Sequence, residues 1–157
     1  PKEDMIMTFS MLLNLVETSN ANTKDLLWKF VKKNNSNIKE KNFPIFDKLI
    51  GYSIKFFNEV IKESKKYKIP SSNEKKALEE LIVALGECND KMSPEEIQTK
   101  IYSVGKENGY KDNLRDWFKL IYEVVFGDVN GPRLGFFISF FGIEETKILI
   151  KEKLNNV

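Results

Sequence analysis

The sequence has 157 residues, 41% of them hydrophobic and 31% charged, which is enough apolar material for one domain or for two small helical subdomains. It contains no histidine and a single cysteine, Cys88, which excludes an internal disulfide, a zinc site and any nucleophile activated by histidine. We therefore expect no catalysis, no metal ion and no bound cofactor in this chain.

The longest apolar runs, such as 134–141, fall far short of the roughly 20 residues that a membrane-spanning helix needs. The chain starts with Pro1-Lys2-Glu3-Asp4, which is acidic where an export signal would be basic. We therefore expect a cytoplasmic protein with no membrane partner. A start at proline rather than methionine favours a segment of a longer protein.

The net charge of +2 is unevenly distributed. Between Lys24 and Lys68 there are twelve lysines against five acidic residues, a local charge of +7 that leaves −5 for the remainder. This asymmetry indicates a surface that faces a polyanion. A solvated, lysine-rich face would produce the same pattern, and both interpretations stay open.

Helical periodicity runs through the whole chain, and no stretch alternates polar and apolar residues. Helix starts are marked by Pro44, by Asn113 and by the capping boxes that begin at Ser71 and Ser93. We expect helices at about 8–16, 23–33, 44–68, 71–85, 93–108, 113–126, 132–141 and 144–154, the last turns of the third being basic. The fold class is therefore all-α, an irregular bundle or cage of about eight helices over residues 1–157. It forms either one unit or two subdomains, at about 1–68 and 71–157.

The same periodicity predicts which helix faces are buried. The second helix is expected to bury Leu26, Leu27, Phe30 and Val31, and the third helix a stripe that includes Val60. In the last third of the chain, core positions are expected for Trp117, Phe118, Ile121 and Val125, while Phe136, Phe137, Phe140 and Phe141 cannot all point inward.

Arginine occurs only twice in this lysine-rich chain, as Arg115 and Arg133, and both are predicted in the first turn of a helix. The helix dipole disfavours a cation there by about 0.3–1 kcal/mol, so the placement indicates a function. Gly131-Pro132-Arg133 at a helix start would combine free amides with a guanidinium, which favours phosphate or base recognition. An ordinary ion pair with Asp112, Asp116 or Asp128 is the alternative.

Aromatic side chains are candidates for stacking against nucleobases. Trp28 is the best of them, because Lys29, Lys32 and Lys33 surround it in the sequence. The predicted RNA-binding residues are therefore Arg133, Arg115, Trp28, Lys32 and Lys111.

Two stretches of the chain have a recognisable residue pattern. The first is Phe9-Ser10-Met11-Leu12-Leu13-Asn14-Leu15, with Asn20-Ala21 and Leu27-Trp28-Lys29-Phe30. The second is Val104-Gly105-Lys106, then Asn113-Leu114-Arg115-Asp116-Trp117-Phe118, Ile121-Tyr122-Glu123-Val124-Val125-Phe126-Gly127 and Gly131-Pro132-Arg133-Leu134-Gly135-Phe136-Phe137. In their order and spacing these stretches resemble the class I lysyl-tRNA synthetase family across nearly the whole chain, and the match is weakest between about residues 33 and 70.

The resemblance implies the C-terminal, anticodon-binding region, which is similar to an α-helix cage. The ATP-binding signature and the Lys-Met-Ser-Lys-Ser loop of the family belong to its catalytic part, and neither is present here. The implied role is to bind lysine tRNA and position it for ATP-dependent aminoacylation by an N-terminal catalytic domain, so the full-length protein would be a lysine–tRNA ligase. The alternative function is a helical interaction domain that docks a protein partner through its Phe-rich C-terminal face.

Overall fold

The fold is entirely helical in the computed structural model, which describes residues 6–33 and 35–155. Within these residues there are eight α-helices and no strand, which confirms the predicted fold class. The chain divides into two compact units, residues 1–64 and residues 65–157. The acidic start of the chain, Pro1 to Asp4, lies outside the described residues, as does Asn34.

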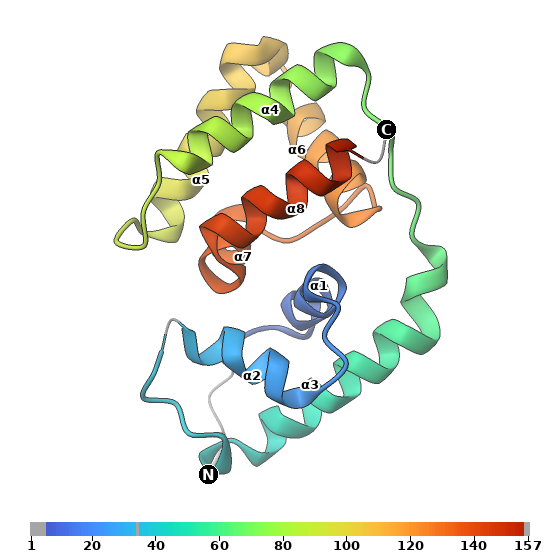
Figure 1. The fold of residues 1–157 in the computed structure, drawn as a ribbon, viewed down its shortest axis with the longest axis vertical. Coiled ribbons are helices and arrows are strands. Elements are labelled where there is room, and N and C mark those ends of the chain that lie inside the picture. Colours follow the sequence, from blue (N-terminus) through green and yellow to red (C-terminus); the bar gives the residue numbers. More distant parts are fainter. Residues whose placement is uncertain (1–5, 34, 156–157) are drawn as a thin grey trace. The chain divides into compact units, whose positions relative to one another are not determined.

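The first unit contains three α-helices and three shorter helical turns (Figure 1). Their bounds are α1 (Phe9–Ser19), α2 (Lys24–Lys33), η1 (Glu40–Asn42), α3 (Pro44–Phe56), η2 (Phe57–Ile61) and η3 (Lys62–Ser64). The Thr8 hydroxyl caps α1 by accepting a hydrogen bond from the Met11 amide at 3.1 Å. Asn20, with a φ of 54°, ends the helix in the left-handed conformation that asparagine tolerates.

The core of the first unit forms where α1 and α2 pack against α3. Its described apolar residues are Met7, Leu12, Leu15, Val16, Ala21, Leu27, Trp28, Val31, Phe46, Ile50 and Phe57. Two expectations were wrong: Leu26 is 40% exposed and Val60 is 59% exposed. The buried face of α2 therefore differs from the predicted one: Trp28 lies inward, and Leu26, which was expected in the core, lies at the surface.

The helical run that begins at Pro44 ends at Ser64, so the predicted basic last turn at 62–68 is only partly helical. From Lys65 the chain is extended and belongs to the second unit. The Lys66 amide donates to the Gly127 carbonyl at 3.2 Å, and the Lys68 amide donates to the Glu123 carbonyl at 3.0 Å. These bonds to a distant helix end replace the hydrogen bonds that a continued helix would make.

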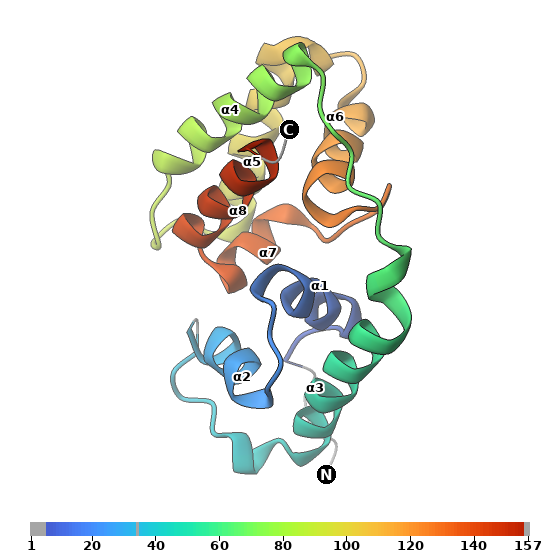
Figure 2. The ribbon, with the colours of Figure 1, turned by 45° about the vertical axis from the view of Figure 1, so that its right-hand side comes forward.

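The second unit contains the remaining five α-helices (Figures 1 and 2). Their bounds, with the turns between them, are α4 (Ser72–Gly86), α5 (Pro94–Gly105), η4 (Lys106–Tyr110), α6 (Leu114–Ile121), η5 (Tyr122–Phe126), α7 (Leu134–Phe141) and α8 (Ile143–Asn155). The capping boxes at Ser71 and Ser93 and the cap at Asn113 are all present, as predicted. Gly109 and Gly127 have φ values of 95° and 64°, which confirms them as helix stops.

In the second unit α5 packs against α4 and α7, and α8 lies along α4. The enclosed side chains are Ala77, Leu78, Leu81, Ile82, Leu85, Ile97, Ile101, Val104, Trp117, Leu120, Ile121, Val124, Val125, Phe126, Leu134, Phe137, Ile138, Phe141, Leu149, Ile150 and Leu154. Phe137 and Phe141 stack within this core, with ring centres 5.3 Å apart, while Phe136 and Phe140 are half-buried. The four phenylalanines of α7 therefore divide between two faces, as their spacing predicted.

Candidate nucleic-acid interface

One face of α6 combines a guanidinium with aromatic rings. Arg115, Phe118 and Tyr122 are three and seven residues apart, so they share a face of the helix. The inward face carries Trp117, which is 0% exposed and donates a hydrogen bond from Nε1 to the Ile101 carbonyl at 2.9 Å. Because this tryptophan fixes the rotation of α6 against α5, the arginine and the two rings are held on the outer side.

A ring from α5 extends this face. Tyr102 lies edge-on to Phe118, with ring centres 5.0 Å apart at 64°, and Phe118 lies 6.3 Å from Tyr122. Tyr102 is 39% exposed, and the other two rings are half-buried. We call Tyr102, Phe118 and Tyr122 the aromatic strip. Accessible rings in a row are the kind of surface on which unpaired nucleobases stack.

Tyr122 connects the aromatic strip to Arg133. Its hydroxyl donates to the Pro132 carbonyl at 2.9 Å, and a Cβ added to Gly131 would lie 2.3 Å from its ring, so the ring packs directly on the glycine backbone. Burial raises the pKa of the Tyr122 hydroxyl, which stays protonated and able to donate at neutral pH. Arg133 follows this contact immediately and is exposed, with its guanidinium carbon 5.3 Å from the centre of the Phe136 ring.

The start of α7 differs from the prediction. Arg133 is the residue before the first helical turn, with a φ of −66° and a ψ of 112°, and Pro132 precedes it. The Gly135 amide donates to the buried Gln98 side chain at 2.7 Å, so an amide expected to bind an anion is already occupied. The Gly135 amide is therefore not free to bind an anion, and the anion site at this helix start stays a prediction for the remaining amides. What remains at this position is the exposed guanidinium of Arg133.

The ion-pair alternative for the two arginines finds no support in the structure. Among residues 6–33 and 35–155, neither Arg115 nor Arg133 forms an ion pair with Asp112, Asp116 or Asp128. Asp116 instead accepts a hydrogen bond at 2.9 Å from the amide side chain of the residue that caps α6. Both guanidinium groups are exposed and are available to a ligand.

Two predicted residues in the first unit are committed to other contacts. Trp28 is 1% exposed, lies edge-on to Phe46 at 5.6 Å, and donates from Nε1 to Asp47 at 2.9 Å. It is a core residue, so the stacking role proposed for it is wrong in this structure. Lys32 pairs with Glu40 at 2.7 Å, which neutralises its charge at the surface.

Lysines extend the interface of the second unit beyond the arginines. Lys111 is exposed just before α6, as a binding role would require. Lys119 is exposed four residues after Arg115, on the same helix face. Lys119 and Tyr102 were not predicted as binding residues, and Phe118, which was expected in the core, is half-buried. The available signal was that Tyr102 falls outside the inward stripe of its own helix.

Comparison with known proteins identifies relatives of the chain. It is similar, over nearly its whole length, to a region of an aminoacyl-tRNA synthetase. The relatives are named lysine–tRNA ligase: those of Rickettsia bellii (strain OSU 85-389) and Rickettsia felis are 38% identical over 148 residues, and that of Rickettsia prowazekii is 37% identical over the same length. Each alignment covers 94% of this chain and 28% of the relative. The resemblance to lysyl-tRNA synthetases is thereby confirmed.

The chain spans just over a quarter of the length of these curated relatives. No family model and no solved structure matches it. In the described part of the chain, no helix has the length and apolar character needed to cross a membrane, and no group of three or more potential metal ligands is found.

Proposed function

We propose that this chain is the anticodon-binding region of a class I lysine–tRNA ligase, which positions lysine tRNA for aminoacylation. In this proposal ATP and lysine are bound by a catalytic domain elsewhere in a cytoplasmic protein, and the chain itself carries no catalytic residue. The observation that carries the proposal is the aromatic strip, flanked by Arg115 and Arg133, in a chain similar to lysine–tRNA ligases.

The chemistry of these residues fits an unpaired RNA segment. Guanidinium groups contact phosphates in a planar, bidentate way and also stack on bases, whereas lysine acts as a point charge. The rings between the arginines offer π faces to bases, and Lys111 and Lys119 add positive charge at the same surface. An anticodon loop presents both unpaired bases and phosphates, so one surface would engage both.

The alternative function, docking of a protein through the Phe-rich face, is not favoured, because most of these phenylalanines are not accessible to a partner. Phe137 is 1% exposed and Phe141 is 5% exposed, so both belong to the core. Phe136 lies beneath the Arg133 guanidinium. Only Phe140 of the four is left half-buried without such a contact, and one ring is too small for a docking face.

The proposal predicts binding of lysine tRNA that depends on its anticodon and on salt. The logarithm of the binding constant should fall with the logarithm of salt concentration by about 0.7–0.9 for each phosphate contacted. Filter-binding titrations with lysine tRNA and with anticodon-substituted lysine tRNA, at several salt concentrations, measure both effects. Equal affinity for the two RNAs would contradict an anticodon role, and the absence of binding would contradict the proposed function.

Arg133→Lys is expected to weaken tRNA binding by about 1–3 kcal/mol, the range for one good bidentate contact. The free energy of unfolding should change by less than about 0.5 kcal/mol, because Arg133 is exposed and forms no ion pair with a described residue. A urea denaturation curve measured beside the binding titration separates the two quantities. Lys76→Ala, which removes an exposed charge from α4, is the control and should leave affinity nearly unchanged. Lost stability with unchanged affinity would assign Arg133 a structural role.

A further inference from the structure

The first unit carries an accessible group of stacked aromatic rings separate from the aromatic strip. Tyr52 on α3 is 56% exposed, and its ring centre lies 5.6 Å from that of Phe9 and 5.8 Å from that of Phe56. The Tyr52 ring is stacked on both neighbours, at interplanar angles of 28° to Phe9 and 21° to Phe56, while Phe9 and Phe56 are tilted by 44° to each other. We call Phe9, Tyr52 and Phe56 the aromatic platform. Phe9 and Phe56 are half-buried and support Tyr52 from the protein side.

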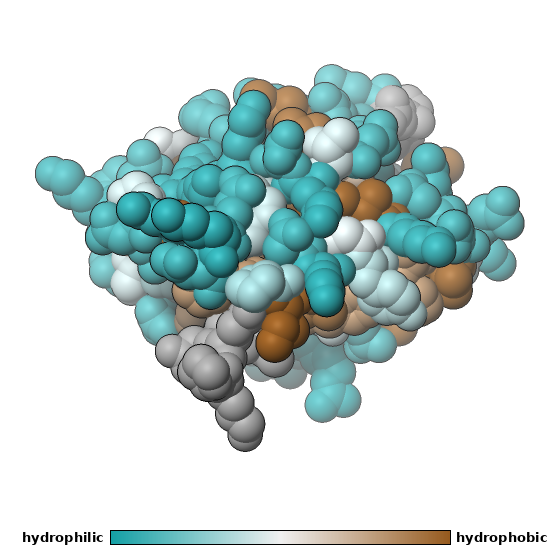
Figure 3. Space-filling view, turned by 90° about the horizontal axis from the view of Figure 1, so that it is seen from below, coloured by the Kyte–Doolittle hydropathy of each residue, from teal (hydrophilic) through white to brown (hydrophobic). Residues whose placement is uncertain are grey.

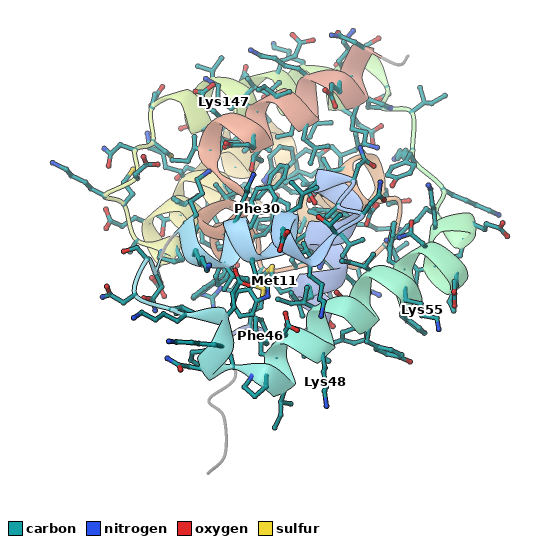
Figure 4. All side chains as sticks on the ribbon, turned by 60° about the horizontal axis from the view of Figure 1, so that its bottom comes forward. Met11, Phe30, Phe46, Lys48, Lys55 and Lys147 are labelled. Carbon is teal, nitrogen blue, oxygen red and sulfur yellow. The ribbon has the colours of Figure 1, made fainter. Side chains whose placement is uncertain are left out.

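Two lysines flank the exposed ring on the same helix. Lys48 precedes Tyr52 by four residues and Lys55 follows it by three, which places all three on one side of α3. Both lysines are exposed, and no acidic residue in the described part of the chain pairs with them. In Figure 4 they are labelled on the outside of α3, while Phe46 lies toward the packed interior of the unit. Their charges are therefore available to a ligand.

Other lysines of this unit are used differently. Lys24 pairs with Asp47 at 2.8 Å and Lys32 with Glu40 at 2.7 Å, so part of the basic excess between Lys24 and Lys68 is neutralised internally. Lys48 and Lys55 form no ion pair with a described residue. Seven residues of helix separate them by about 10 Å along the axis, so they bracket the Tyr52 ring rather than cover it. The face drawn in Figure 3 is mainly hydrophilic, and hydrophobic side chains appear on it as small groups.

We propose that the aromatic platform is a second RNA-contacting surface, on which an unpaired base stacks against Tyr52 while Lys48 and Lys55 contact the phosphates beside it. Charge complementarity selects RNA over an apolar protein segment, because a purely apolar ligand would leave two unpaired lysines at the edge of the contact. The inference rests on the proposed function only in taking RNA as the ligand. It uses no residue of the second unit.

The test measures how the 157-residue chain binds lysine tRNA and a short single-stranded oligouridylate. Tyr52→Leu keeps an apolar side chain against Phe9 and Phe56 but removes the π face, so it should weaken binding by about 5- to 150-fold, the range for loss of one base–aromatic stack. Tyr52→Phe keeps the ring and should bind like the unchanged protein. Lys48→Ala and Lys55→Ala should each reduce the slope of affinity against salt by about one. Circular dichroism melting of each variant confirms that it folds.

The outcomes distinguish the platform from the proposed function. If Tyr52→Leu binds both RNAs as well as Tyr52→Phe does, the platform proposal is overturned, and a protein would be its remaining ligand class. If Arg133→Lys weakens tRNA binding while Tyr52→Leu does not, only the platform fails. If the chain binds oligouridylate through Tyr52 but shows no preference for lysine tRNA, the platform stands and the anticodon role fails.

Discussion

A Trp28→Ala variant is expected to lose about 3–5 kcal/mol of its free energy of unfolding, the usual cost of truncating a fully buried tryptophan. Trp28 is 1% exposed and packs edge-on against Phe46, so its removal leaves a large cavity between α2 and α3. The substitution also removes the hydrogen bond from Trp28 Nε1 to Asp47. The pKa of the Asp47 carboxyl is lowered first by its hydrogen bond from Lys24 and second by this bond from Trp28. Urea denaturation followed by circular dichroism measures the change.

Trp28→Phe is the matched control, because it retains one ring against Phe46 while it loses the indole donor and the second ring. It should cost much less, since Asp47 is about one-third exposed and keeps its bond to Lys24 at 2.8 Å. RNA affinity per folded molecule should be unchanged in the phenylalanine variant. If Trp28→Ala instead left stability intact and weakened RNA binding, the tryptophan would be a stacking residue after all.

Gly135→Ala is expected to destabilise the second unit by about 2–6 kcal/mol. The added Cβ would lie 2.1 Å from the Pro94 backbone oxygen and 3.2 Å from the Gln98 Cβ, so α7 must move away from α5. Overpacking of this kind costs about 1–3 kcal/mol. The movement also breaks the buried bond from the Gly135 amide to Gln98, and an unsatisfied buried group costs about 1–3 kcal/mol more. Thermal and urea denaturation of the variant provide the measurement.

Gly86→Ala makes the same chemical change in open surroundings. A Cβ there would meet only the flexible end of Lys147, at 3.4 Å, and Gly86 is helical at the end of α4. Alanine should therefore be neutral or stabilising by up to about 1 kcal/mol. A similar loss in both variants would mean that the close approach of α7 to Pro94 does not govern stability.

The packing around Gly135 also determines where Arg133 lies. It is two residues from Gly135, and the bond between Gln98 and Gly135 holds the start of α7 against α5. The glycine-rich segment that carries the family resemblance therefore has a structural purpose. Gly131 accommodates the Tyr122 ring, Gly135 accommodates α5, and Arg133 is presented between them.

The places where helices start and stop were predictable from the sequence alone. Ser71 and Ser93 cap their helices through residues three positions away, and Gly109 and Gly127 end helices by adopting positive φ angles. These interactions are local, so the residue types and their spacing are sufficient to specify them. The all-α class and the approximate number of helices follow from the same local chemistry.

The orientation of side chains about each helix was decided only by tertiary contacts. Trp28 turns inward because its ring packs against Phe46, 18 residues away, and its indole N–H donates from there to Asp47. Lys66 leaves the helical path because Gly127, far along the chain, supplies its hydrogen-bond partner. In α2 the helix itself forms as predicted, but Trp28 is in the core and Leu26 is at the surface.

The candidate interface shows the same division. The scarcity of arginine and its position near helix starts identified Arg115 and Arg133 from the sequence. The ring that completes the aromatic strip, Tyr102, lies on a different helix, and its contact with Phe118 exists only because α5 and α6 pack together. Helix periodicity predicts that a residue faces outward, but it does not predict which outward-facing residues of two separate helices lie next to each other. That depends on how the helices pack, because the distances between their side chains are determined by contacts remote in the sequence.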